Sequence, residues 1–230
     1  MANVKAVEIY ESGKLDEVFE KTLHPGGLTL TNRIAEIAQI NRDSNVLDIG
    51  CGRGESALFL TKKYKCRVVG IDSSKKLPRP NHEKVNFLVA DAERLPLTSQ
   101  SFDIVFSECS FSQLSDKKKA AKEVKRVLKP GGKFLFHDVF LKKEADVKDF
   151  PMPCISGAMT LEGYLELLEN IGFQEPYVED HSKELKKIGY KILTTYGTIE
   201  NFLSIFDAEK TELKNLKLKL GYALISVTRR

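Results

Sequence analysis

The chain lacks any hydrophobic run long enough to cross a membrane. None of its 230 residues lies in an apolar stretch approaching the roughly 18–20 residues that a membrane-spanning helix needs. The first eight residues, Met1–Glu8, also lack the apolar core of a signal peptide. The sequence has no internal repeat, no low-complexity tract and no linker that would divide it. We therefore expect a cytoplasmic protein with no membrane partner.

Cysteine is scarce, and its spacing excludes two common kinds of site. The chain has four cysteines that lie far apart: Cys51, Cys66, Cys109 and Cys154. None of them forms a Cys-x-x-Cys pair, which argues against a zinc site and against a disulfide framework. We therefore expect no metal.

A strong excess of one charge is also absent. The net charge of +4 is too small to indicate nucleic-acid binding from composition alone. One expected helix, residues 117–128, carries a face of lysines: Lys118, Lys122, Lys125 and Lys129. A solvated helix face explains this stripe, with RNA binding as the alternative. We expect no nucleic-acid partner.

The most informative segment is an apolar strand that runs into a glycine-rich turn. Residues Val46–Ile49 form the strand, and Gly50-Cys51-Gly52-Arg53-Gly54 come directly after it. Glycine adopts positive φ angles without strain and lets a ligand approach the backbone closely. Such a turn is common to many nucleotide-binding folds, so its meaning depends on the later strands of the chain.

Two further strands each end on an acidic residue. The segment Arg67–Ile71 is followed by Asp72, and Val85–Val89 is followed by Ala90 and Asp91. Asp72 lies 22 residues after Gly50, where an acid suits the two hydroxyls of a ribose.

Five motifs in this order resemble the class I S-adenosylmethionine-dependent methyltransferases. They are Val46–Gly54, Val69–Ser73, Val89–Ala92, Ser101–Phe106 and Arg126–Gly132. The Asp-x-Gly-x-Gly-x-Gly form that starts at Asp48 differs from the Gly-x-Gly-x-x-Gly of dinucleotide dehydrogenases. The resemblance implies S-adenosylmethionine as cofactor and a small-molecule acceptor, as in the quinone, sterol and metalloid methyltransferases.

Alternating strands and helices predict an α/β fold with a doubly wound, mostly parallel sheet. The resemblance implies a Rossmann-like methyltransferase fold of seven strands, with an antiparallel last strand and added N-terminal and C-terminal helices. We expect a single domain over residues 1–230. It would comprise an N-terminal helical cap (1–40), a cofactor-binding core (41–140) and substrate-side elements (141–230), with a helical insertion at about 182–218.

Local signals place several helix ends. Residues 4–22 have an amphipathic pattern with a break near Ser12-Gly13. Residues 28–40 and 182–206 are also expected to be helical. Thr160 has the character of an N-cap residue, and Gly172 is expected to end the helix that Thr160 begins.

Ligands of doubly wound sheets bind at the carboxyl ends of the strands. The resemblance implies that ten residues at these ends hold the cofactor: Asp48, Gly50, Cys51, Gly52, Gly54, Asp72, Ser73, Asp91, Ala92 and Ser107. Asp72 would bind the ribose, Asp91 and Ala92 the adenine, and Asp48 the amino-acid end. The transferred methyl group would lie near Ser107–Phe111.

Methyl transfer is an in-line displacement that depends mainly on alignment, so the sequence need not display a catalytic triad. The catalytic residues are therefore unknown, with four candidates: His137, Cys109, Cys154 and His24. His137 could act as a base or be a core histidine. His24 could belong to a lid loop or simply separate two helices.

Several alternatives remain open. Cys109 and Cys154 could hold a soft element for metalloid or thiol methylation, or they could be small buried side chains. The segment Ser107–Phe111 lacks the Asn-Pro-Pro-Tyr-type motif of enzymes that methylate amino groups of adenine or glutamine, which favours a small-molecule acceptor. A regulatory module that binds the cofactor without catalysis and an RNA methyltransferase are the other hypotheses. The sequence does not identify the acceptor or the oligomeric state.

Overall fold

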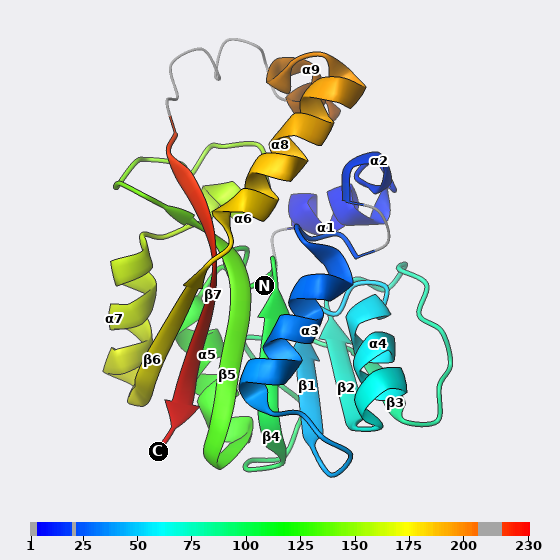
Figure 1. Cartoon of the computed structure of the whole chain (residues 1–230), viewed down its shortest axis with the longest axis vertical. Coiled ribbons are helices and arrows are strands. Elements are labelled where there is room, and N and C mark those ends of the chain that lie inside the picture. The colour runs from blue at the N-terminus through cyan, green and yellow to red at the C-terminus, as the bar shows by residue number, and fades with distance from the viewer. Residues whose placement is uncertain (1–3, 20–21, 207–217) are drawn as a thin grey trace.

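The computed structural model describes residues 4–19, 22–206 and 218–230. A seven-stranded sheet with the order β3-β2-β1-β4-β5-β7-β6 forms its centre (Figure 1). The strands are β1 (Asn45–Ile49), β2 (Arg67–Asp72), β3 (Val85–Val89), β4 (Phe102–Glu108), β5 (Leu128–Leu141), β6 (Phe173–Asp180) and β7 (Leu220–Arg229). Strands β1 to β5 pair in parallel, while β7 runs antiparallel to both β5 and β6. The expected doubly wound sheet with an antiparallel last strand is confirmed.

Side chains alternate between two apolar layers, one on each face of the sheet. Val46 and Ile104 pack with α3 (Gly27–Ala38) and α4 (Glu55–Tyr64). Their sequence neighbours Leu47 and Val105 point to the other face, against α5 (Lys117–Val127) and α7 (Leu161–Ile171). Because both faces are covered by helices, the central strands are apolar on both sides.

A group of helices stands over the end of the sheet where the parallel strands finish (Figure 1). Two come from the N-terminus, α1 (Val4–Glu11) and α2 (Asp16–Phe19), and the others are α6 (Pro153–Ser156), α8 (Ser182–Tyr196), α9 (Ile199–Leu203) and the 3₁₀ turn η1 (Ser204–Phe206). Leu15 and Val18 of the N-terminal segment share one apolar cluster with Ile192, Phe202 and Phe206. The expected N-terminal and C-terminal helices therefore meet each other on this side of the sheet.

Some element boundaries differ from the expectations. The segment 182–206 is helical but is interrupted at Gly197, whose φ of 76° ends α8. Strand β5 begins at Leu128, within the motif Arg126–Gly132, because Leu128 pairs with Phe102 of β4. The remainder of the expected insertion, residues 207–217, lies outside the described residues. No helix in the described ranges is long and apolar enough to cross a bilayer.

Candidate functional site

The glycine turn after β1 borders a cavity at the carboxyl end of the sheet. Gly50 and Gly52 have φ angles of 72° and 51°, which L side chains rarely adopt. A Cβ atom on Gly50 would collide with the Ser110 side chain, whereas one on Gly52 would meet no atom closer than Leu23 Cδ1 at 4.0 Å. The turn therefore presents bare backbone to open space at Gly52.

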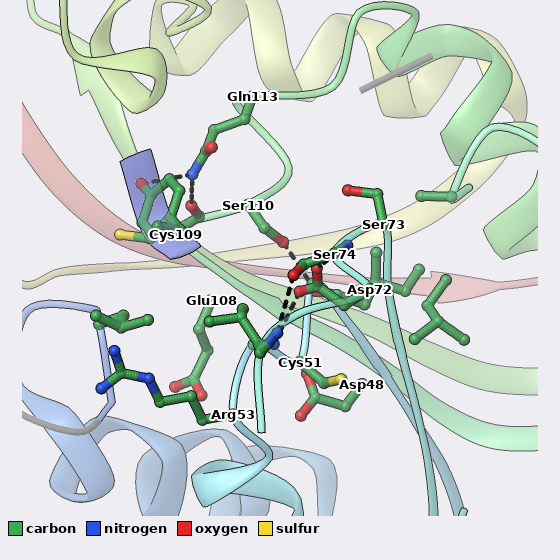
Figure 2. A pocket seen from close by; sticks show the side chains of 18 of the residues that line it. Asp48, Cys51, Arg53, Asp72, Ser73, Ser74, Glu108, Cys109, Ser110 and Gln113 are labelled. Carbon is green, nitrogen blue, oxygen red and sulfur yellow. Dashed lines mark hydrogen bonds between the residues drawn. The ribbon is translucent and has the colours of Figure 1, made fainter. Parts of the chain in front are cut away.

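This first cavity has a volume of about 1070 Å³ including its mouth. Figure 2 shows side chains that line it, and the lining residues come from the ends of β1, β2, β3 and β4, from α1 and from residues 22–24. Eight of the ten expected cofactor residues lie in its wall: Asp48, Gly50, Cys51, Gly52, Asp72, Ser73, Asp91 and Ala92. The candidates His24 and Cys109 line it as well.

Two of the expected cofactor residues do not line the cavity. Gly54 is the N-cap of α4, and a Cβ atom there would collide with the Phe87 ring. Ser107 is fully buried in β4, and its hydroxyl lies 2.6 Å from Ser110 Oγ. Ser110 reaches the wall in its place and donates a hydrogen bond of 2.8 Å to the Ile49 carbonyl.

Asp72 accepts a backbone hydrogen bond on each of its oxygens, one of them from the glycine turn (Figure 2). Its Oδ2 accepts from the Gly52 amide at 2.9 Å, and its Oδ1 accepts from the Ser74 amide at 2.8 Å. Arg79 lies behind it, with Nη2 3.8 Å from Oδ1, and donates to the Gly52 carbonyl at 3.0 Å. The carboxylate is thus oriented before any ligand arrives. Arg79 lies in a loop for which the sequence predicted no role.

A second acidic group occupies another part of the wall. Asp48 is 2 % exposed, and its Oδ2 has no hydrogen-bond partner among the described residues. Its pKa is raised well above the ordinary value, first by burial and then by the negative charges of Glu108 and Asp72. A buried carboxyl beside other acidic groups, with one oxygen unpaired, is suited to receive a cation.

Glu108 was not expected from the sequence, yet it is tightly held in the same wall. Its carboxylate accepts hydrogen bonds from Ser56 Oγ at 2.7 Å and from Thr31 Oγ1 at 3.0 Å. His24 Nε2 lies 3.4 Å from its Oε2, while Nδ1 of the same ring lies 3.2 Å from the Pro25 carbonyl. His24 therefore ties the N-terminal segment to the end of β4.

His137 does not line this cavity. It is 0 % exposed, and neither ring nitrogen has a hydrogen-bond partner among the described residues. Its ring stacks on Tyr222 at 5.7 Å between centroids, and burial lowers its pKa well below the ordinary value. A base must reach the proton that it removes, and His137 does not reach the cavity. Its position therefore fits the alternative of a core histidine.

A second cavity, of about 1500 Å³ including its mouth, lies beside the first, and three residues line both: Tyr10, Leu23 and Cys109. Its wall is formed by the helices over the sheet, the segment that contains α6 and the end of β5. Cys154 lies in this wall, so the two candidate thiols both border the second cavity. Burial raises the pKa of Cys154 to about 12 and that of Cys109 well above its ordinary value, so both are thiols rather than thiolates.

The shared wall is held by α1 and the loop after β4. Gln113 Nε2 donates to the Tyr10 hydroxyl at 2.9 Å and also to the Cys109 carbonyl. Cys109 has a φ of 51°, uncommon for a residue with a side chain, and its thiol lies 3.5 Å from the Tyr222 hydroxyl. Across the described ranges, no group of three or more His, Cys, Asp or Glu side chains is arranged to hold a metal ion.

Comparisons with known proteins agree with this architecture. Residues 47–136 match the family model described as a methyltransferase domain. The chain is 28% identical over 220 residues to phosphoethanolamine N-methyltransferase 3 of Arabidopsis thaliana, covering 90% of this chain and 45% of that protein. It is also 28% identical over 230 residues to the 27-O-demethylrifamycin SV methyltransferase of Amycolatopsis mediterranei strain S699, covering 89% of this chain and 84% of that protein.

A solved structure shows the same fold. Phosphoethanolamine N-methyltransferase 2 of Haemonchus contortus superimposes with a TM-score of 0.76 at 20% identity, over 95% of this chain and 57% of that one. This chain therefore spans less than half of the plant relative and a little over half of the nematode protein. Residues 47–136 thus match a methyltransferase domain, and the chain has the fold of a solved methyltransferase.

Proposed function

We propose that the chain transfers the methyl group of S-adenosylmethionine to a small-molecule acceptor, with the cofactor in the first cavity. The observation that carries this assignment is the oriented carboxylate of Asp72 beside the open backbone of Gly52. Each oxygen of Asp72 accepts one amide hydrogen bond, so each retains a lone pair for a ribose hydroxyl. Asp91 and Ala92, in the same wall, would contact the adenine.

The other acidic groups fit the amino-acid end of the cofactor. Asp48 and Glu108 both line the cavity, and Asp48 has an oxygen without a partner among the described residues. An ammonium group placed between these carboxylates would relieve their mutual repulsion and supply the missing donor. We assign this position to the α-ammonium of the methionine part of the cofactor.

When bound, S-adenosylmethionine supplies an electrophilic methyl group on a sulfonium ion. The residues of this chain contribute alignment and exclusion of water, effects that are worth up to roughly 7–11 kcal/mol in a well-oriented reaction. Tyr10, Leu23 and Cys109 stand where the two cavities meet and so form the boundary between donor and acceptor. Because Gln113 bonds both Tyr10 and the Cys109 backbone, it fixes the width of that boundary.

The structure disfavours two alternatives. Metalloid methylation through Cys109 and Cys154 would use thiolates, and burial raises the pKa of both groups, which makes that form less favourable. Two of the lysines that suggested RNA have partners within the protein: Lys125 donates to the carbonyls of Ile171 and Gly172, and Lys129 pairs with Asp103.

The first test is cofactor affinity. Replacing Asp72 with alanine removes two charge-assisted hydrogen bonds to ribose, each worth about 1.5–3 kcal/mol. We expect Asp72→Ala to bind S-adenosylhomocysteine at least about a hundredfold more weakly in calorimetry, on the same per-bond scale. Asp43→Ala is the matched control, since Asp43 is exposed at the opposite end of β1. Equal affinity in the Asp72 variant and the wild type would refute the site assignment.

Activity is tested with radiolabelled S-adenosylmethionine and a fractionated cell extract. Label in the small-molecule fraction is the expected result, whereas label in RNA or protein would contradict the substrate class. If no label is transferred although the cofactor binds, the result favours a regulatory module or an acceptor that is missing from that extract.

A further inference from the structure

The second cavity is lined almost entirely by apolar groups. Aliphatic, aromatic and sulfur-containing side chains make up most of its wall, and many of them come from α6, α8 and α9. Among its lining residues in the described part of the chain, Glu200 is the only charged one, and it is exposed. A wall of this kind stabilises an occupant by removing apolar surface from water, at about 25 cal/mol per Å².

Because the described residues place no charged group in the interior of this wall, the cavity does not suit a charged ligand. A phosphate, carboxylate or ammonium group buried here would lose its hydration without gaining a partner, which costs several kcal/mol per ion. A charged phosphoamine or amino acid therefore does not suit this cavity, although the relatives include enzymes named for phosphoethanolamine and for sarcosine. The volume, about 1500 Å³ with the mouth, instead admits a bulky molecule.

Two polar groups lie at the boundary between this cavity and the first one. The Tyr10 hydroxyl and the Cys109 thiol lie in the wall that the two cavities share. Burial raises the pKa of Tyr10 well above its ordinary value, so both groups are neutral. A neutral polar group of an occupant would find hydrogen-bond partners here.

We propose that the second cavity binds the methyl acceptor, and that this acceptor is a bulky, mainly apolar molecule with one neutral hydroxyl at the shared boundary. The proposal rests on the methyl-transfer function proposed above. In the reaction, the hydroxyl oxygen forms a bond to the methyl carbon while the carbon–sulfur bond breaks, and the electron pair of that bond stays on sulfur. The hydroxyl proton leaves to water.

Gly189 of α8 offers a sharp test, because it lines the cavity and a Cβ atom added to it would meet no atom within 4 Å. Gly189→Phe therefore fills the cavity without a clash at Cβ, and replacing a helical glycine favours the helix. Lys186→Phe, on an exposed position of the same helix, is the matched control. The probe is N-phenyl-1-naphthylamine, a neutral apolar dye that becomes fluorescent in apolar sites.

We expect the wild type and Lys186→Phe to bind the dye saturably and Gly189→Phe to bind it at least tenfold more weakly. Failure of the wild type to bind the dye, or equal binding by Gly189→Phe, would overturn the assignment of this cavity. Calorimetry with S-adenosylhomocysteine is run on all three proteins, and we expect both variants to bind it with the affinity of the wild type. If the wild type itself does not bind S-adenosylhomocysteine, the proposed function is refuted independently of the dye.

Phosphoethanolamine supplies the converse test. At millimolar concentration it should neither displace the dye nor accept label from radiolabelled S-adenosylmethionine. Transfer of label to phosphoethanolamine would show that a charged acceptor is used and would overturn the proposed acceptor class.

Discussion

Glu108 is expected to contact only the amino-acid part of the cofactor and not its nucleoside part. It lies in the wall of the first cavity, where Ser56 and Thr31 hold its carboxylate in place. Asp72, in contrast, is bonded to the turn beside the proposed ribose position. Removing charge at 108 should therefore affect only ligands that carry the amino-acid group, whereas removing Asp72 should affect every ligand with a ribose.

We expect Glu108→Gln to weaken S-adenosylhomocysteine binding by about tenfold, since hydrogen bonds to charged groups contribute about 1.5–3 kcal/mol. The affinity for 5′-methylthioadenosine, which lacks the amino-acid group, should stay within about twofold on the same energy scale. Asp72→Ala serves as the comparison and should weaken both ligands. Equal weakening of both ligands by Glu108→Gln would assign Glu108 a purely structural role.

Asp138 is a further buried carboxyl, and its protonation affects stability rather than binding. It accepts hydrogen bonds from the Ser112 amide at 2.7 Å and from Ser112 Oγ at 2.6 Å. Burial raises its pKa from 3.8 to about 6, although the bonds from Ser112 act in the opposite direction. Between these two pH values the folded chain retains a proton that the unfolded chain has released. The contribution of Asp138 to stability therefore falls as pH rises from about 4 to about 6.

Asp138→Asn should remove this pH dependence because the amide does not titrate. We expect the free energy of unfolding of the wild type, relative to the variant, to fall by on the order of 3 kcal/mol between pH 4 and pH 7. Urea unfolding at several pH values measures the difference. A difference that is constant across this range would show that Asp138 titrates normally in the folded protein.

At the residue scale, the sequence identified the groups that lie within a motif and missed those that tertiary packing brings in. Asp72 ends β2, and its spacing from the glycine turn predicted it, whereas Asp48, one residue before the end of the adjacent β1, was implied by the family resemblance. Arg79 and Gln113 lie in loops, and Tyr10 lies 103 residues from Gln113, its hydrogen-bond partner. No local pattern records such a contact. The glutamate at 108 ends a strand, which was the one available signal for it.

At the element scale, prediction succeeded where chemistry and periodicity agreed. Thr160 caps α7 by accepting from the Gly163 amide at 3.1 Å, and Gly172 ends that helix with a φ of 87°. The break at Ser12–Gly13 separates α1 from α2, as the sequence indicated. Strand β5 begins before Pro130 and two glycines that by themselves indicate a turn. These residues form an irregularity in the strand, between the Leu128–Phe102 and Lys133–Ile104 pairs with β4. Tertiary pairing overrode the local signal there.

Helix α8 shows that the sequence can predict where an insertion lies but not which of its residues line a cavity. Its length beyond a minimal fold was visible in the sequence, and it was expected to cover the substrate side. Which residues face a cavity depends on how the helix packs against α2 and α9, and this cannot be read from one helix alone. Leu185, Ile188 and Ile192 lie on the cavity face at helical spacing, with Gly189 between them.

At the scale of the whole molecule, the N-terminal segment connects the two cavities. Tyr10 lines both, Val7 lines the first, and Leu15 and Phe19 line the second. The segment is tied to the glycine turn by Arg53, which donates to both oxygens of Asp16 at 2.8 and 3.0 Å. It is tied to the other side by Tyr196, whose hydroxyl donates to Glu17 at 3.1 Å. A ligand in either cavity therefore contacts the same segment.

Shared contacts of this kind predict positive coupling between the two ligands. We expect the ligand that binds first to restrain residues 4–19 further, so that the second ligand no longer bears that entropic cost. We expect S-adenosylhomocysteine to tighten binding of N-phenyl-1-naphthylamine by about five- to tenfold, toward the lower end of typical coupling energies. The same factor must appear when the dye is saturating and the nucleoside is titrated, because linkage is reciprocal.

Asp16→Ala tests whether the segment carries this coupling. Asp16 is exposed, and a pair of this kind contributes about 0–1 kcal/mol to global stability, so the fold should persist. The affinity for each ligand alone should change little, while the coupling factor should fall toward one because the glycine turn no longer holds α2. Fluorescence titration at zero and saturating S-adenosylhomocysteine measures the factor in both proteins. If coupling is unchanged in Asp16→Ala, it passes through the shared boundary at Tyr10 and Cys109 instead of through the pair that Asp16 forms with Arg53.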